Sequence, residues 1–219
     1  SEINLDAYVE GVNYNFAEHR AETGAGQIVL GQTATIGFWA GRKGKKLIES
    51  LNGSKYSTEL GDWLASEFPN IYGKLAGKTN KAVAKFYKKL FKTTKRRCRR
   101  GRHRKHGSSL ANNLRDLNAQ VMATALAIYV TDSDLAGNTA ERYGFLVTTE
   151  GLGAATFSVG DSGEAFGLGI GDSRVMSIWN ILKATNDQAV DGRLYDMDIM
   201  LRELADKVYT MINEIGAID

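Results

Sequence analysis

The stretch AQVMATALAIYV, residues 119–130, decides the fold, because only two of its side chains are wholly polar. A helix of this composition is apolar on nearly every side, so we expect it at the centre of the domain with other helices wrapped around it. The two polar side chains, Gln120 and Thr124, lie one helical turn apart. We expect them to hydrogen-bond to each other or to a neighbouring backbone group, the alternative being that they line a pocket.

Apolar residues recur at helical spacing in three segments before this stretch and in two segments after it. Such stripes are typical of amphipathic helices that pack one face against a core. The second helix is expected to stop at Pro69, and the third to be capped by Thr79 or Asn80. The five stripes are, in chain order, Leu47, Ile48 and Leu51; Leu60, Trp63, Leu64 and Phe68; Val83, Phe86, Leu90 and Phe91; Val175, Ile178, Trp179 and Leu182; and Met197, Leu201, Leu204, Val208, Met211 and Ile215.

Two short segments have the composition of strands. FLVTT (residues 145–149) and AATFSV (residues 154–159) flank Gly151-Leu-Gly153, which predicts an antiparallel hairpin about that turn. The sequence therefore predicts an α+β domain that is predominantly helical, with about six helices and one small hairpin.

The chain is expected to form one domain behind an extended N-terminal segment. Its 219 residues suit a single domain, and 43% hydrophobic content is too high for a disordered chain. No run of 18 apolar residues occurs, so we expect no membrane span. Strand-forming residues among the first 18 predict extended structure there. We assign residues 1–31 to the N-terminal segment or linker and residues 32–219 to the helical domain.

The net charge of +3 hides a strong segregation of charge along the chain. Residues 68–115 contain 16 Lys and Arg and no Asp or Glu, whereas the other 171 residues contain 12 Lys and Arg and 25 Asp and Glu. A block of this charge repels itself unless something offsets it. Either the acidic remainder of the chain folds against it, or it meets a polyanion.

The basic residues fall into a helix stripe and a denser run after it. Four lysines lie opposite the apolar stripe of the third helix, and residues 95–109 lack large apolar side chains, which predicts a loop or a frayed extension of that helix. Either these residues are solvated, or they bind nucleic acid, an anionic surface or an acidic polysaccharide. The candidate polyanion site comprises Lys81, Lys85, Lys88, Lys92, Lys95, Arg96, Arg97, Arg99, Arg100, Arg102, Arg104 and Lys105.

The sequence contains no assembled catalytic motif, so we expect no enzyme. The three histidines, His19, His103 and His106, fall in the connector or the basic run, where none is held beside a serine. No nucleophile elbow, zinc-protease helix or phosphate-binding loop occurs. Asp62 and Glu67 flank Trp63 and suit an acid/base pair, although solvent-facing helix carboxylates are the more common case.

No cofactor is expected, with calcium as the weaker alternative. Asp132 and Asp134 begin like an EF-hand loop, but the twelfth position is Tyr143 and not Glu. We expect the two aspartates to cap a helix instead. The lone Cys98, surrounded by arginines, suits an intermolecular disulfide better than a zinc site.

An ordered series of segments along the chain resembles one bacterial family. In chain order the segments are QTATIGFW (32–39), LIESLNG (47–53), LGDWLA (60–65), FPNIYG (68–73), LAGKTN (75–80), LNAQVMA (117–123), YGF (143–145), GAATF (153–157), AVDGRLY (189–195) and INEIG (212–216).

The family is an uncharacterised domain near the C-terminus of large secreted bacterial surface proteins of planctomycete type, where it follows Ig-like repeats of the SdrD/Cna B type. The resemblance covers most of residues 13–218, and NYNFAE (13–18) looks like the last strand of such a repeat. It implies an extracellular or cell-surface location and a non-catalytic structural or adhesive role, with extracellular matrix or cell-surface polymers as partners. It transfers no catalytic residue, and the basic run at Arg96–Arg104 is longer than in the family pattern.

Overall fold

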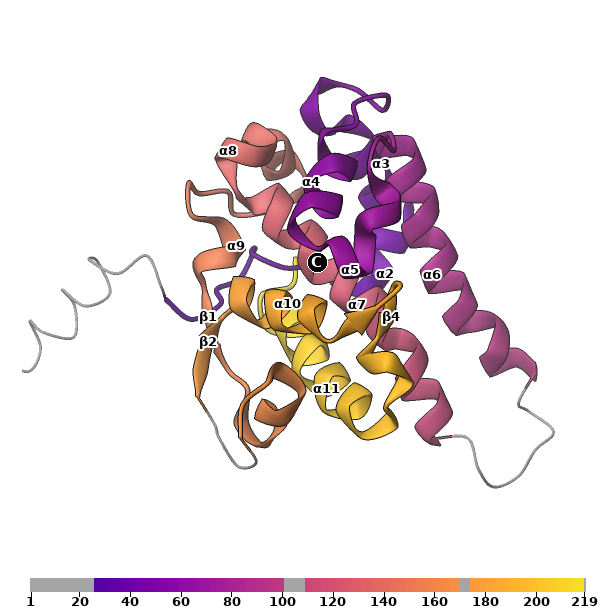
Figure 1. Ribbon diagram of the computed structural model, residues 1–219. Coiled ribbons are helices and arrows are strands. Elements are labelled where there is room, and N and C mark those ends of the chain that lie inside the picture. Colours follow the sequence, from indigo (N-terminus) through magenta and orange to yellow (C-terminus); the bar gives the residue numbers. More distant parts are fainter. Residues whose placement is uncertain (1–25, 101–108, 170–173, 219) are drawn as a thin grey trace, which may run out of the picture.

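The fold is built around helix α7 (Ser109–Thr131), which contains the stretch that the sequence places at the centre (Figure 1). The computed structural model describes residues 26–100, 109–169 and 174–218, with side chains outside residues 93–116. Every side chain from Ala119 to Val130 is buried. The expected central helix is therefore confirmed.

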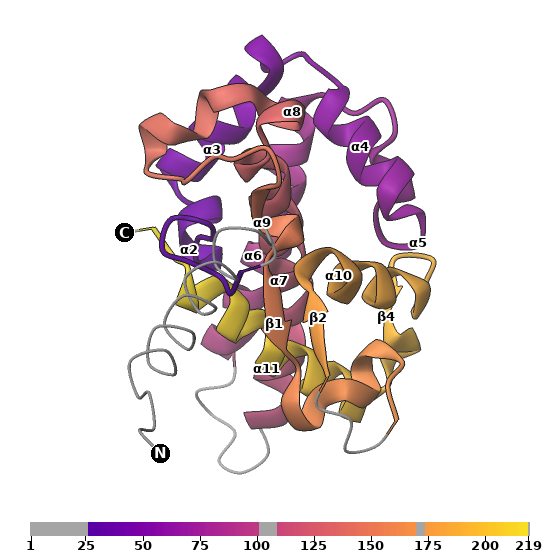
Figure 2. The same cartoon turned by 90° about the vertical axis from the view of Figure 1, so that its left-hand side faces the viewer.

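Several of the described helices lie against α7. Among them are α2 (Ile36–Ala40), α6 (Asn80–Arg100) and α11 (Ile199–Ile215). Helix α6 runs along one flank of the molecule, on the right in Figure 1, whereas the hairpin of β1 (Thr156–Ser158) and β2 (Val175–Ser177) lies on the opposite side, which faces the viewer in Figure 2. The basic residues of α6 are therefore presented on a single flank.

The described residues contain ten α-helices, so the expected number of about six is too low. Six of them span nine residues or more, and the other four span four or five residues. A helix of one turn has no repeating apolar stripe from which a pattern can be recognised. The remaining α-helices are α3 (Arg42–Ser50), α4 (Glu59–Glu67), α5 (Pro69–Tyr72), α8 (Ser133–Ala136), α9 (Gly151–Ala154) and α10 (Ile178–Asp187), and 3₁₀ turns occupy Leu51–Gly53, Gly73–Leu75, Gly137–Tyr143, Gly160–Phe166 and Tyr195–Met197.

The strands form two small antiparallel hairpins, neither of which is the predicted one. Strand β1 (Thr156–Ser158) pairs with β2 (Val175–Ser177), and Phe157 lies opposite Met176. Strands β3 (Ala189–Val190) and β4 (Arg193–Leu194) form the second pair. The helical α+β class is confirmed, and β1 lies within the second predicted strand, but the pairing of residues 145–149 with residues 154–159 is wrong.

The backbone of the first predicted strand (residues 145–149) forms hydrogen bonds with segments that its own sequence does not reveal. The Leu146 N–H donates to the Gly31 carbonyl (2.8 Å), and the Thr148 N–H donates to the Thr131 carbonyl (2.9 Å). The predicted turn belongs to α9, where the Leu152 N–H donates to the Thr131 hydroxyl (2.8 Å). The end of α7 and a distant loop therefore satisfy the backbone groups that a hairpin would have used.

The buried apolar side chains form one continuous cluster that reaches both ends of the described chain. Ile28 belongs to this cluster, and the Gly31 N–H donates to the Gly216 carbonyl (3.0 Å), so the described end of the N-terminal segment packs against the domain. The predicted extended structure over residues 1–18 lies outside the described residues. Among the described helices, none combines the length and the apolar composition that crossing a bilayer requires.

A lysine-lined groove as the candidate functional site

Helix α6, which carries the predicted lysine stripe, begins at a well-defined point. The Thr79 hydroxyl accepts from the Ala82 N–H (3.3 Å), so of the two predicted capping residues Thr79 is the cap. The Asn80 side chain is buried and donates to the Leu51 and Ser54 carbonyls (2.8 and 3.0 Å). These bonds tie the start of α6 to the preceding elements and fix which face of the helix turns outward.

The two faces of α6 differ sharply in exposure. On the inner face Val83 and Tyr87 are fully buried, and the Tyr87 hydroxyl donates to the Ile36 carbonyl (3.2 Å). Helical periodicity then places the lysines outward. The exposed lysines of this helix are Lys81, Lys85, Lys88, Lys89 and Lys92.

The outward face of α6 forms one side of a groove of about 770 Å³. We call it the lysine groove. Six of its nine lining residues are lysines, and the other three supply an apolar surface. The lining residues are Lys74, Leu75, Lys78, Ala82, Lys85, Phe86, Lys88, Lys89 and Lys92.

The second wall of the groove is brought to α6 by a tight turn. Gly77, with φ of +67°, reverses the chain between Leu75 and Lys78. The Gly77 N–H donates to Oδ1 of Asp62 (2.6 Å), which holds the turn against α4. This hydrogen bond, followed by one from the Thr58 side chain, lowers the pKa of Asp62. Asp62 is thus a structural anchor for the groove wall.

Phe86 places an aromatic ring on the groove surface. The ring is half-buried, and the ammonium of Lys74 lies 5.0 Å from its centroid. An ammonium at this distance over an aromatic face is attracted by the ring quadrupole. The contact therefore holds Lys74 over the groove while leaving its charge in place.

The charge of four of the six groove lysines is not neutralised by the described part of the chain. There, no carboxylate lies within ion-pair distance of Lys78, Lys85, Lys88 or Lys92. Like charges spaced three and four residues apart on a helix repel one another. An anionic partner would relieve this repulsion, whereas a cationic one would increase it.

The structure brings together three of the predicted lysines and extends the predicted helix. Lys85, Lys88 and Lys92 line the groove, whereas Lys81 is exposed but does not line it. Helix α6 continues to Arg100, so of the two predictions for residues 95–100 the extension of the helix is confirmed and the loop is wrong, because no residue before Gly101 breaks the helix. Lys95, Arg96, Arg97, Arg99 and Arg100 belong to α6, and Arg102, Arg104 and Lys105 lie outside the described residues.

Sequence reasoning missed six groove residues, namely Lys74, Leu75, Lys78, Ala82, Phe86 and Lys89. The acid-free composition of residues 68–115 already includes the three lysines, which was a usable signal. Helical spacing alone does not reveal Lys74 and Lys78, because they reach α6 through the turn at Gly77.

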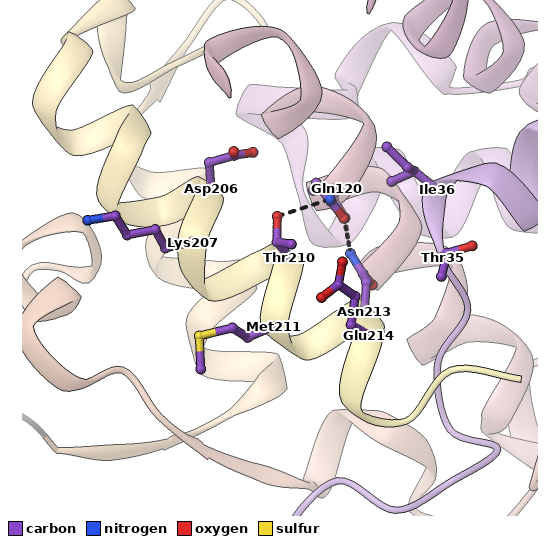
Figure 3. A pocket seen from close by; sticks show the side chains of 9 residues that line it. All are labelled: Thr35, Ile36, Gln120, Asp206, Lys207, Thr210, Met211, Asn213 and Glu214. Atoms are coloured by element: carbon purple, nitrogen blue, oxygen red, sulfur yellow. Dashed lines mark hydrogen bonds between the residues drawn. The ribbon is translucent and has the colours of Figure 1, made fainter. Parts of the chain in front are cut away.

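A second cavity, of about 580 Å³, lies between α7, α11 and the start of α2, and it contains Gln120 (Figure 3). Oε1 of Gln120 accepts from the Asn213 side chain (2.8 Å), and its Nε2 donates to the Thr210 hydroxyl (3.0 Å). The Thr124 hydroxyl donates to the other amide atom of Asn213 (3.1 Å). The Thr124 hydroxyl also lies within hydrogen-bond distance of the Gln120 carbonyl (3.3 Å), so the predicted bond to a neighbouring backbone group is confirmed, and Gln120 in addition lines a cavity.

The carboxylates considered for chemistry are held by structural contacts. Oε2 of Glu67 lies 2.9 Å from the Lys183 ammonium, which also stacks on Trp179. Oδ1 of Asp132 accepts from the Asp134 and Leu135 N–H groups and so caps α8, as predicted. Asp134 lies in the first turn of that helix and does not cap it.

No cluster of metal-ligating side chains occurs in the described ranges, where no three His, Cys, Asp or Glu side chains converge. The three histidines and the side chain of Cys98 lie outside what the structure describes. The expected disulfide of Cys98 therefore stays a prediction.

Comparison with known proteins leaves the chain without an assigned class. No family model, no curated protein and no solved structure matches it. The resemblance to the bacterial surface-protein domain rests on the ordered sequence segments alone.

Proposed function

We propose that this chain is a polyanion-binding module and that the lysine groove is its binding site. One observation carries the proposal: six lysines from two separate segments converge on one groove of about 770 Å³. A solvated helix face would explain the lysines of α6, but it does not require Lys74 and Lys78 to be anchored opposite them.

The groove suits an acidic polymer better than a small anion. Lys85, Lys88 and Lys92 lie at helical spacing, so their Cα atoms are distributed over roughly 10 Å of the helix axis. A row of cations of this length matches repeated negative charges along a chain. Binding of this kind releases counterions and weakens steeply as salt increases.

The test compares retention on immobilised heparin between two variants of equal charge. The groove variant replaces Lys78, Lys85, Lys88 and Lys92 with Gln, and the control variant replaces four exposed lysines elsewhere, Lys43, Lys46, Lys55 and Lys207. We expect the groove variant to elute at much lower salt than the control. Equal elution of the two variants would contradict the proposal, because it would show dependence on net charge alone.

We further propose that the module is non-catalytic and adhesive, and holds acidic polymers of a cell surface or extracellular matrix. The resemblance to the surface-protein domain supports this setting, and the structural roles of Asp62, Glu67 and Asp132 support the absence of acid/base chemistry. A turnover assay with glycans, peptides and esters tests it. Hydrolysis abolished by a single substitution of a cavity residue would overturn this second proposal.

A further inference from the structure

A cleft of about 480 Å³ on another part of the molecule has a different chemistry from the lysine groove. Two half-buried tryptophans, Trp63 of α4 and Trp179 of α10, line it together with residues from α7, α8 and α9. Helix α9 lies on the side facing the viewer in Figure 2, away from α6. The volume falls in the range of small-molecule sites, which measure roughly 300–1,000 Å³.

The two indole rings are fixed before any ligand arrives. Trp63 packs edge-to-face on Phe68 and on Tyr129, with centroid distances of 5.5 and 5.1 Å. Trp179 lies 5.5 Å from Phe68 and carries the Lys183 ammonium 5.0 Å from its ring centroid. Rings held in this way lose little freedom on binding, which favours affinity.

The residues that line the cleft carry hydrogen-bond donors that the described protein does not use. The indole N–H groups of Trp63 and Trp179 have no acceptor among the described residues, and neither is sealed from solvent, unlike that of Trp39. The Ser177 hydroxyl accepts from the Asn180 N–H (3.2 Å), so its own hydrogen remains available to a ligand.

The same cleft also offers acceptors. Only Oδ1 of Asp132 caps α8, which leaves its second oxygen without a partner in the described chain. Glu150 is exposed at the rim and has no hydrogen bond there either. Donors, acceptors and two aromatic surfaces therefore line one cavity.

We propose that this tryptophan cleft binds a neutral saccharide. A sugar ring presents C–H groups to an aromatic face and hydroxyls that both donate and accept, so it can satisfy every polar group described here. An anion would meet the carboxylates of Asp132 and Glu150. A cation would not accept hydrogen bonds from the indole and hydroxyl donors. A wholly apolar ligand would leave all these polar groups desolvated and without partners.

Gly153 gives a variant that blocks the cleft without removing a contact. An added Cβ would lie 3.5 Å from Ile128 and 3.8 Å from Trp179, both cleft residues, at ordinary contact distance. Gly153 does not need a left-handed backbone, so Gly153→Leu fills the space without backbone strain. Glu150→Ala is a milder second variant, because its exposed side chain makes no bond in the described chain.

The experiment follows the three indole N–H signals in a ¹H–¹⁵N spectrum during titration. The probes are cellohexaose, maltohexaose and xylohexaose at up to about 10 mM, which saturates a site of millimolar Kd. We expect at least one probe to shift the Trp63 and Trp179 signals saturably, while the signal of the buried Trp39 stays in place. Affinity should fall about ten-fold or more in Gly153→Leu, or measurably in Glu150→Ala if the first variant does not fold.

Two controls separate this proposal from its alternatives. The four-lysine groove variant should bind the saccharide as the parent chain does, which keeps the test independent of polyanion binding. No shift with any of the three saccharides, or unchanged affinity in the variants, would overturn the proposal. A saturable shift with tetramethylammonium and with no saccharide would also overturn it, in favour of a cation site.

Discussion

At the residue scale, Gly61 sets the position of one wall of the lysine groove. A Cβ at this position would collide with the Lys78 carbonyl oxygen and lie 2.8 Å from the Leu75 carbonyl oxygen. The close approach is what allows the turn that carries Lys74 and Lys78 to pack on α4. The groove therefore depends on a residue that has no functional group.

We expect Gly61→Ala to lower the free energy of unfolding by about 1–3 kcal/mol, because the turn must move away from the added methyl group. It should also weaken heparin binding by displacing Lys78. Thermal unfolding and column retention measure the two effects. The matched control is Gly73→Ala, where nothing lies within 4 Å and φ is −50°, so the substitution should be neutral or slightly stabilising. Equal behaviour of the two variants would argue against this role of Gly61.

The ionisation of Tyr129 makes the stability of the folded state depend on pH in the alkaline range. Burial raises the pKa of Tyr129 to about 12, with the hydrogen bond to Asn52 acting in the opposite direction and the charges of Glu59 and Asp132 adding to the increase. The folded state thus favours the neutral phenol more than the unfolded state does, for which the pKa is 10.0. Its contribution to stability is complete below pH 10 and is lost as the pH rises towards about 12.

We expect the melting temperature to fall between pH 10 and pH 12, and to fall less in Tyr129→Phe, which has no phenol to ionise. Melting curves of the two proteins across this range test the expectation. Tyr72 and Tyr209 are also buried with raised pKa values, so both proteins should still lose some stability. Identical pH dependence of the two proteins would show that Tyr129 is not responsible.

At the scale of elements, the helices follow from sequence pattern and the strands do not. The apolar stripes of α3, α4, α6, α10 and α11 repeat over several turns, so local spacing is sufficient to predict them. The hairpin prediction failed because Leu146 and Thr148 bond to Gly31 and Thr131, which are far away in sequence. Three of the six groove lysines were predictable, because they repeat at helical spacing along α6. The wall that contains Lys74 was not predictable, because its contact with α6 does not follow from local spacing.

The helical course of α6 to Arg100 leads to a prediction about its basic end. Helical periodicity places positions 96 and 100 on the same side of α6 as Lys85 and Lys89, which line the groove. A polymer that extends from the groove along α6 would meet this side first. Positions 95 and 99 continue instead the line of Lys81, which is exposed but does not line the groove.

We therefore expect Arg96→Gln with Arg100→Gln to weaken heparin binding several-fold. The control, Lys95→Gln with Arg99→Gln, removes the same charge from the same helix and should have a smaller effect. Affinities measured at one fixed salt concentration give the comparison. A larger loss in the control pair would mean that the polymer does not follow the groove axis.

At the scale of the whole molecule, the chain separates its charges into a basic block and an acidic remainder. The described acidic residues do not neutralise four of the six groove lysines, because Lys78, Lys85, Lys88 and Lys92 have no described carboxylate within ion-pair distance. This geometry supports the proposal that an external polyanion, and not an internal acidic cover, offsets the charge of these lysines.

The most direct test of this account is the salt dependence of binding to a short DNA duplex, used as a polyanion of known charge spacing. Each cation that contacts the duplex contributes about 0.9 to the slope of log K against log salt concentration. We predict that the groove variant (Lys78, Lys85, Lys88 and Lys92 to Gln) has a slope smaller by about three to four than the parent chain, whereas the control variant (Lys43, Lys46, Lys55 and Lys207 to Gln) keeps the parent slope. A slope that is unchanged in the groove variant, or reduced equally in the control, would contradict the assignment of the lysine groove as the polyanion site.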